Sequence, residues 1–231
     1  MTIIRKHSMT SDMRQLAPSE YPPQLLEIPG VPKQLYTRGS WPKEGTKMLA
    51  VVGSRALSDY GREACEKLIA GLAGYPISIV SGLALGADAC AHRAALRAGL
   101  HTIAVLASGI DDATISPRTH FELAQEILNA GGAIISEHEA GYQPFPSDFP
   151  ERNRIVAGLS QAILIVEAAK DSGTLITARL SHEYNRDLLC IPHRIGDPQG
   201  FGANLYLRLG ATLVAEPSHI LEELHLEPRV E

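Results

Sequence analysis

Two glycine-bearing turns, each joining an apolar strand-like run to a helix-like run, constrain the fold of this chain most strongly. The first turn, Gly53-Ser54-Arg55, follows the apolar residues 48–52, and the second, residues 81–88, follows the apolar residues 77–80. A buried strand that stops at such a turn and continues as a helix leaves backbone N–H groups pointing away from the sheet edge. The two turns therefore predict a binding site for a phosphorylated ligand.

From residue 48 onward, apolar runs alternate with segments of helical periodicity. Strands are expected at 49–52, 77–80, 102–106, 133–136, 162–167, 188–191 and 212–214, and helices near 59–73, 87–98, 119–130, 153–160, 174–185 and 202–209, with a last short helix from Pro217. Near-continuous apolar strands separated by amphipathic helices indicate a parallel sheet covered on both faces. We therefore predict an α/β fold with a doubly wound, mainly parallel, Rossmann-like sheet. Ligands of such sheets bind beyond the C-terminal ends of the strands.

The chain is expected to form one domain with a short N-terminal extension. Residues 1–20 are polar and without periodicity, and we expect them to be mobile. Residues 21–47 are punctuated by prolines and predict an extended lead-in packed against the domain. Residues 48–231 then form the single Rossmann-like domain.

Charge and cysteine usage narrow the class of protein. The formal net charge is −5, from 21 basic and 26 acidic residues, so any nucleic-acid contact must be concentrated in a local patch. Cys65, Cys90 and Cys190 lie far apart and form no CxxC pair, which favours buried free thiols over a disulfide framework or a zinc site. No metal site and no cofactor is predicted.

The chain carries no sequence signal for the membrane or for export. No run is long and apolar enough to span a bilayer, and the N-terminus lacks the apolar stretch of a signal peptide. We therefore expect a cytoplasmic protein without a membrane partner.

The first turn departs from a dinucleotide-binding loop. A GxGxxG motif would need small residues close to the pyrophosphate, whereas this turn carries Arg55, which disfavours NAD or FAD. A guanidinium beside backbone N–H groups suits a phosphate monoester or a nucleic-acid backbone. A surface arginine paired with a nearby acid is an equally good interpretation.

Four further residues near the expected strand ends carry polar or charged side chains. Asp88 is best explained as the N-cap of the next helix, and His92, one turn later, as a packed histidine rather than a catalyst. Arg152 and Arg154 stand at the expected start of a helix, where the dipole disfavours cations. A negative partner must compensate them, either an internal acid such as Glu137 or Glu167 or a bound phosphate. We favour the phosphate for the pair, with at least one arginine structural.

The loop after the fifth expected strand of the parallel sheet carries Ser172-Gly173-Thr174, whose hydroxyl and N–H groups would otherwise be ordinary helix caps. No nucleophile and base are placed together, so no catalytic residue is predicted. The predicted phosphate- or DNA-binding residues are Gly53, Ser54, Arg55, Ser81, Gly82, Leu83, Gly86, Arg152, Asn153, Arg154, Ser172, Gly173 and Thr174.

In order and spacing these motifs resemble the DprA/Smf family of DNA processing proteins, which bind single-stranded DNA and help load RecA. The resemblance runs from Tyr21-Pro22-Pro23 to about Val214. It includes the segments 52–55, 81–88, 102–106, 149–155, 166–168, 172–178 and 202–204. It implies a positively charged pocket for consecutive DNA phosphates at the strand-end loops, a homodimer, and a role in DNA uptake or recombination with RecA as a possible partner.

The chain also departs from the family pattern. Leu85 replaces a basic residue, Asp111 and Asp112 bring two acids near the expected DNA edge, and His193 replaces a glycine. An alternative is a nucleotide-binding protein or a nucleotide phosphoribohydrolase of the same superfamily, although the loop at 171–174 lacks the glycines of such enzymes and Glu183, the nearby acid, is expected to face solvent. A third interpretation is a catalytically silent oligomer with a relict pocket.

Overall fold

The computed structural model describes residues 13–227, and within them a single nine-stranded sheet has the order β1-β2-β6-β5-β4-β3-β7-β8-β9. Its strands are β1 (Arg14–Gln15), β2 (Tyr36–Gly39), β3 (Lys47–Val52), β4 (Ile77–Ser81), β5 (His101–Leu106), β6 (Ala133–Ser136), β7 (Ala162–Ile165), β8 (Asp187–Cys190) and β9 (Thr212–Leu213). Strands β3 to β9 run parallel, whereas β1 and β2 join one edge in the antiparallel sense. The predicted α/β, mainly parallel Rossmann-like fold is confirmed.

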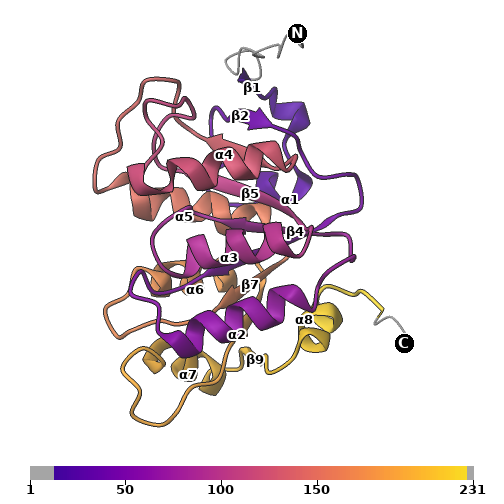
Figure 1. Ribbon diagram of the computed structural model, residues 1–231, viewed down its shortest axis with the longest axis vertical. Coiled ribbons are helices and arrows are strands. Elements are labelled where there is room, and N and C mark those ends of the chain that lie inside the picture. Colours follow the sequence, from indigo (N-terminus) through magenta and orange to yellow (C-terminus); the bar gives the residue numbers. More distant parts are fainter. Residues whose placement is uncertain (1–12, 228–231) are drawn as a thin grey trace, which may run out of the picture.

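Helices cover both faces of the sheet (Figure 1). They are α1 (Pro23–Leu26), α2 (Asp59–Ala70), α3 (Ala87–Arg97), α4 (Phe121–Asn129), α5 (Asp148–Leu159), α6 (Thr174–Glu183), α7 (Phe201–Arg208) and α8 (Pro217–Glu223), with 3-10 turns at Pro18–Glu20 and Arg118–His120. Helices α2, α3, α4 and α8 pack on one face, and α1, α5, α6 and α7 pack on the other. Between residues 13 and 227, no helix is long and apolar enough to cross a membrane.

The central strand β3 shows why the strands are apolar along their whole length. Met48, Ala50 and Val52 pack into the core beneath α5, while Leu49 and Val51 pack into the core beneath α2 and α3. Successive side chains of a strand point to opposite faces, and both faces of this sheet are covered. The five buried residues of β3, 48–52, are therefore all apolar, and the strand's one polar residue, Lys47, stands at its half-buried start.

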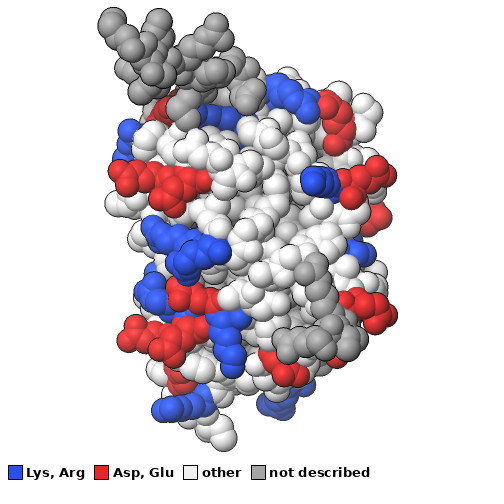
Figure 2. Space-filling model, turned by 45° about the vertical axis from the view of Figure 1, so that its right-hand side comes forward, with Lys and Arg blue, Asp and Glu red and all other residues white. Residues whose placement is uncertain are grey.

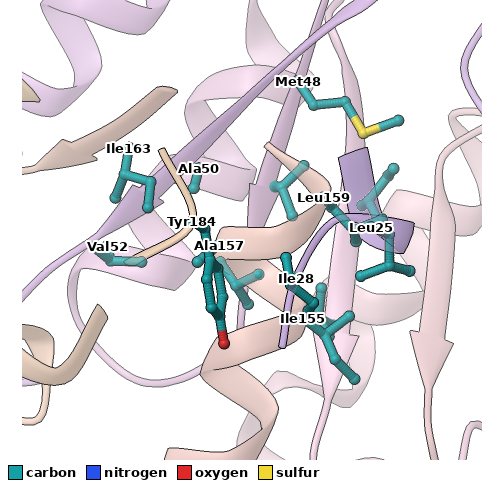
Figure 3. Close-up of a cluster of buried hydrophobic side chains, with 14 of the residues drawn as sticks. Leu25, Ile28, Met48, Ala50, Val52, Ile155, Ala157, Leu159, Ile163 and Tyr184 are labelled. Carbon is teal, nitrogen blue, oxygen red and sulfur yellow. The ribbon is translucent and has the colours of Figure 1, made fainter. Parts of the chain in front are cut away.

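The N-terminal lead-in is fastened to α5. Leu25 and Ile28 pack against Ile155 and Leu159 (Figure 3), and the Gln24 side-chain amide donates to the carbonyl oxygen of Leu159 over 2.8 Å. A side chain at Gly158 would bring its Cβ within 2.8 Å of Ile28. This close approach explains the glycine near the end of α5.

The lead-in also extends the sheet, which the sequence did not predict. Strand β2 pairs with β6, and β1 pairs in turn with β2. Of the segment 1–20, residues 1–12 lie outside the described residues, while residues 13–20 hold β1 and a 3-10 turn and bury Leu16. The buried side chain of Leu16 and the pairing of β1 with β2 hold this segment in place. Neither feature produces a periodic pattern in the sequence.

Helix α5 begins at Asp148, earlier than the predicted start at 153. Pro150 lies in the first turn of α5, where N–H groups have no intrahelical acceptor, so proline fits there. Asp148 also accepts a hydrogen bond from the backbone N–H of Phe145 over 2.7 Å, which fixes the entry to the helix. The earlier start changes the direction in which the two arginines of α5 point.

Candidate functional site

The sheet contains one point where the chain changes direction, and a cavity lies there. The chain runs from β3 outward through β4, β5 and β6, then returns to place β7 on the other side of β3. The loops after β3 and β7 consequently diverge, which is the usual ligand site of such sheets. A cavity of about 850 Å³ occupies this position, between these loops, the loop after β4 and the first turns of α5 and α6.

Nine of the thirteen predicted site residues line this cavity: Gly53, Ser54, Arg55, Gly82, Arg152, Asn153, Ser172, Gly173 and Thr174. Residues from the connections after β3, β4 and β7 and from the first turns of α5 therefore converge on one volume. Ser81, Leu83, Gly86 and Arg154 are not among its lining residues.

Three of those four residues shape the loop after β4. The Ser81 hydroxyl is buried and donates to the carbonyl oxygen of Val51 over 2.6 Å, and Leu83 packs into the core beneath α4. Gly86 has φ +74°, and a Cβ there would lie 2.2 Å from the carbonyl oxygen of Ser54. Only glycine allows the two turns to approach this closely.

Arg152 lines the cavity, but its buried guanidinium also links α5 to the backbone of the loop after β4 and of β5. Its guanidinium donates to the carbonyl oxygens of Gly82 and Val105, and its side chain also bonds Asn153. Burial lowers the pKa of Arg152, and the nearby Asp88 carboxylate opposes that shift. A cation that is satisfied by backbone carbonyls is committed to the fold before any ligand arrives.

Asp88 does not act as the predicted N-cap. It is the second residue of α3, and its Oδ2 accepts hydrogen bonds from the backbone N–H of Gly82, at 3.1 Å, and of Ala84, at 3.2 Å. Burial raises the pKa of Asp88, and the positive charge of Arg152 works against that rise. The carboxylate closes the turn after β4 instead of the helix end.

Arg154 has an internal partner. Its guanidinium contacts both carboxylate oxygens of Glu137 at the end of β6, with about a fifth of each side chain exposed. Because α5 begins at Asp148, Arg154 lies in the second turn and faces β6 rather than the cavity. Glu167, the other acid considered, is fully buried and accepts from the backbone N–H and the hydroxyl of Ser58.

The positive charge available to a ligand comes from two other side chains. Among the described residues that line the cavity, Arg55 and Lys170 are exposed cations without an ion-pair partner. The Arg55 guanidinium lies 5.7 Å from the ring centroid of Phe149. Lys170 was not predicted, because a single lysine between Ala169 and Asp171 forms no pattern, although its place in the loop after β7 was a usable signal.

The departures from the family pattern lie away from the cavity lining. Asp112 pairs with Arg38 at 2.5 Å, and Asp111 accepts hydrogen bonds from Thr114 and from the backbone N–H of Gly141. Leu85 is half-exposed and does not line the cavity. Asp111 and Asp112 thus stabilise the loop after β5 instead of facing the ligand site.

Further predictions concern the burial of His92 and of the three cysteines and the exposure of Glu183, and these are confirmed. His92 is fully buried and bonded to Thr102, and Cys65, Cys90 and Cys190 are buried free thiols. Glu183 is exposed on α6. In the described part of the chain, no group of three or more His, Cys, Asp or Glu side chains is arranged to hold a metal ion.

Comparison with known proteins identifies the family. Residues 13–225 match the model of DNA recombination-mediator protein A. The chain belongs to this family. It is 44% identical to Protein Smf of Escherichia coli strain K12 over 204 residues, which cover 88% of this chain and 54% of that relative. This chain thus spans about half the length of the Smf proteins of E. coli and Synechocystis.

Solved structures of the family agree with the fold. The X-ray structure of DNA processing protein A from Streptococcus pneumoniae matches with a TM-score of 0.86 at 36% identity, covering 96% of this chain and 76% of that one. A structure of the Helicobacter pylori protein, described for its single-stranded DNA binding mode, matches with a TM-score of 0.81 at 29% identity, covering 92% and 95%.

Proposed function

We propose that this chain binds single-stranded DNA in the cavity between β3 and β7, without catalysis, and acts in DNA uptake or recombination. The observation that carries the proposal is that Arg55 and Lys170, which are exposed and have no ion-pair partner among the described residues, line the cavity together with two strand-to-helix turns rich in backbone N–H groups. Membership of the recombination-mediator family supports it, as does the H. pylori relative, whose structure was described for its binding of single-stranded DNA.

The arrangement favours recognition of the DNA backbone. Phosphate oxygens would accept from Arg55, Lys170 and the N–H groups at the start of α6, near Ser172 to Thr174. On the face shown in Figure 2, Lys and Arg alternate with Asp and Glu and form no continuous basic field. Binding through a few concentrated phosphate contacts predicts little sequence preference and a marked salt dependence.

Hydrolysis of a nucleotide is less well supported by the side chains present. The acids that line the cavity are Asp88 and Asp171 among the described residues. Asp88 is committed to the N–H groups of Gly82 and Ala84, and Glu183 lies outside the cavity lining. Asp171, next to Lys170, is exposed, and none of the described residues fixes its carboxylate by a hydrogen bond, so the cavity lining supplies no buried, positioned carboxylate for hydrolysis.

The homodimer and the RecA partnership are proposals as well. Leu205, Leu209 and Leu213 recur every four residues from α7 into β9, each more than a third exposed. A row of exposed apolar side chains on a folded domain is typical of a protein interface. We assign it to a second copy of this chain, and we infer RecA loading from family membership alone.

Fluorescence anisotropy with a labelled oligo(dT) strand tests the proposal. Arg55→Ala and Lys170→Ala should each weaken binding about tenfold, and each should lower the salt slope by about 0.7, the value expected for one lost contact to a single strand. Arg93→Ala, which removes an exposed arginine of α3 outside the cavity lining, is the matched control. Absence of binding at low salt, or tight competition by a mononucleotide, would reject DNA binding in favour of a nucleotide site.

A further inference from the structure

The connection between β6 and α5 carries a cluster of three rings outside the cavity lining, two of them half-buried and the third exposed. His138 and Tyr142 stack with their centroids 3.8 Å apart and their planes 3° apart, and Phe145 meets Tyr142 edge to face at 6.4 Å. Phe145 is 63% exposed. Large apolar side chains displayed together on a surface loop usually mark a binding surface.

Specific hydrogen bonds hold this aromatic cluster in place. The Tyr142 hydroxyl and the backbone N–H of Phe145 both donate to Oδ2 of Asp148, at 2.9 and 2.7 Å. The carbonyl oxygen of Tyr142 accepts from the N–H of Gly109, and Asp111 accepts from the N–H of Gly141. The rings are therefore presented on a braced loop, which lowers the entropy cost of stacking a ligand on them.

The aromatic cluster is linked to the wall of the cavity through the start of α5. Asp148, which fixes both Tyr142 and Phe145, is the first residue of α5, and the next two residues, Phe149 and Pro150, line the cavity. Arg55 lies over the ring of Phe149. A strand that leaves the cavity past the N-terminal end of α5 would pass the loop that carries Phe145.

We propose that His138, Tyr142 and Phe145 form a base-stacking subsite for the part of a single strand that extends beyond the cavity. The proposal rests on the proposed function. Stacking on aromatic rings accepts any base, because every base has a π-face. The segment 137–147 contains no Lys or Arg and includes the exposed Glu139, so the bases, not the phosphates, should face it.

The experiment compares short and long strands. Oligo(dT) from about four to about twenty nucleotides should bind the wild-type protein more tightly once the strand outgrows the cavity. Phe145→Ala should leave the affinity for the shortest bound strand unchanged and weaken that for long strands about tenfold or more, with the same effect at low and high salt. Leu26→Ala, which removes an exposed apolar side chain of α1 outside the cavity lining, is the matched control.

A spectroscopic variant tests direct contact. Phe145→Trp in a Trp41→Phe background carries one tryptophan, because Trp41 is the single tryptophan of the chain. Its fluorescence should be quenched by long strands and not by the shortest bound one. If Phe145→Ala binds long strands as tightly as the wild type, the subsite is rejected and DNA binding in the cavity stands. If the wild type binds no strand at all, the proposed function fails and this inference fails with it.

Discussion

Arg152 donates a hydrogen bond from its guanidinium to the carbonyl oxygen of Gly82, so a helix on one face of the sheet holds the turn that follows β4. Asp88 accepts from the N–H of the same glycine, at 3.1 Å. A Cβ at Gly82 would lie 2.4 Å from the guanidinium atoms. The turn at Gly82 is thus bound at its carbonyl oxygen by Arg152 and at its N–H by Asp88, two buried groups of opposite charge.

Because of these hydrogen bonds, we expect Arg152 to contribute strongly to the free energy of unfolding. Arg152→Ala leaves the buried Asp88 without its compensating charge and two carbonyl oxygens without a donor, so we expect a loss of about 3–5 kcal/mol in the free energy of unfolding. Urea denaturation followed by circular dichroism measures it. Arg55→Ala, at an exposed site, should change stability by less than about 0.5 kcal/mol. Equal stability of the Arg152→Ala variant and the wild type would contradict the assignment.

The sequence left two roles open for Arg154, as a ligand of a DNA phosphate or as the partner of an internal acid, and a substitution distinguishes them. Because its guanidinium is bound to Glu137 outside the cavity lining, Arg154→Gln should leave the affinity for oligo(dT) within about twofold of the wild type. The same change should cost about 1–3 kcal/mol of stability, since it leaves a partly buried carboxylate unpaired. Glu137→Gln is the matched variant and should cost a similar amount. A tenfold loss of DNA affinity on Arg154→Gln would instead make this arginine a phosphate ligand.

Because His92 is buried in its neutral form, we expect the free energy of unfolding to fall at acidic pH. The Thr102 hydroxyl donates to the carbonyl oxygen of Ile79, so it must accept from Nδ1–H of His92, and Nε2 is left buried without a partner. Burial, and then the charge of Arg152, lower the pKa of His92 from 6.5 to about 3. Because the folded protein holds the neutral form, this contribution to stability is complete above pH 6.5 and is lost as the pH falls toward 3.

The measurement is the free energy of unfolding between pH 7 and pH 4, compared with His92→Asn, which keeps a donor for Thr102 and does not titrate. The wild type should lose about 1.4 kcal/mol per pH unit more than the variant once the pH is below 6. Parallel curves for the two proteins would show that His92 is protonated in the fold without cost.

Sequence periodicity predicted the parallel strands because each is buried on both faces, and Leu49 and Ala50 of β3 are examples. It missed β2, whose Arg38 interrupts the apolar pattern. In the structure that arginine is buried, donating to Asp112 and to the carbonyl oxygen of Ile110. A strand held by antiparallel pairing and one internal ion pair leaves no periodic signal.

The sequence predicted the loops of the candidate site and one of its two free cations, Arg55, but not the second, Lys170. The turns at Gly53 and Gly82 predict the cavity because both need glycine, Gly53 to lie close to Ala87 and Gly82 to lie close to Arg152. The direction of Arg152 and Arg154 depends on where α5 begins, and a start five residues earlier turns both toward internal partners. Lys170 carries no sequence pattern at all, so only the fold brings it to Arg55.

The exposed row on α7 gives a prediction for assembly. Leu209 is 69% exposed, and Leu205, one turn before it, is 37% exposed. Pairing of two copies through this row would remove these side chains from water, which stabilises association by roughly 25 cal/mol per Å² of apolar surface. Leu209→Asp would place a charge in that interface, and we expect it to convert a dimer into a monomer.

Sedimentation equilibrium at micromolar concentration distinguishes the two masses. Leu26→Asp, an equally drastic change at an exposed leucine of α1, should leave the dimer intact. The short-strand affinity of the Leu209→Asp monomer should equal that of the wild type, because its cavity is complete within one chain, while binding of long strands loses the gain from two linked sites. A wild-type protein that stays monomeric at all concentrations would refute the interface, as would a Leu209→Asp variant that still dimerises.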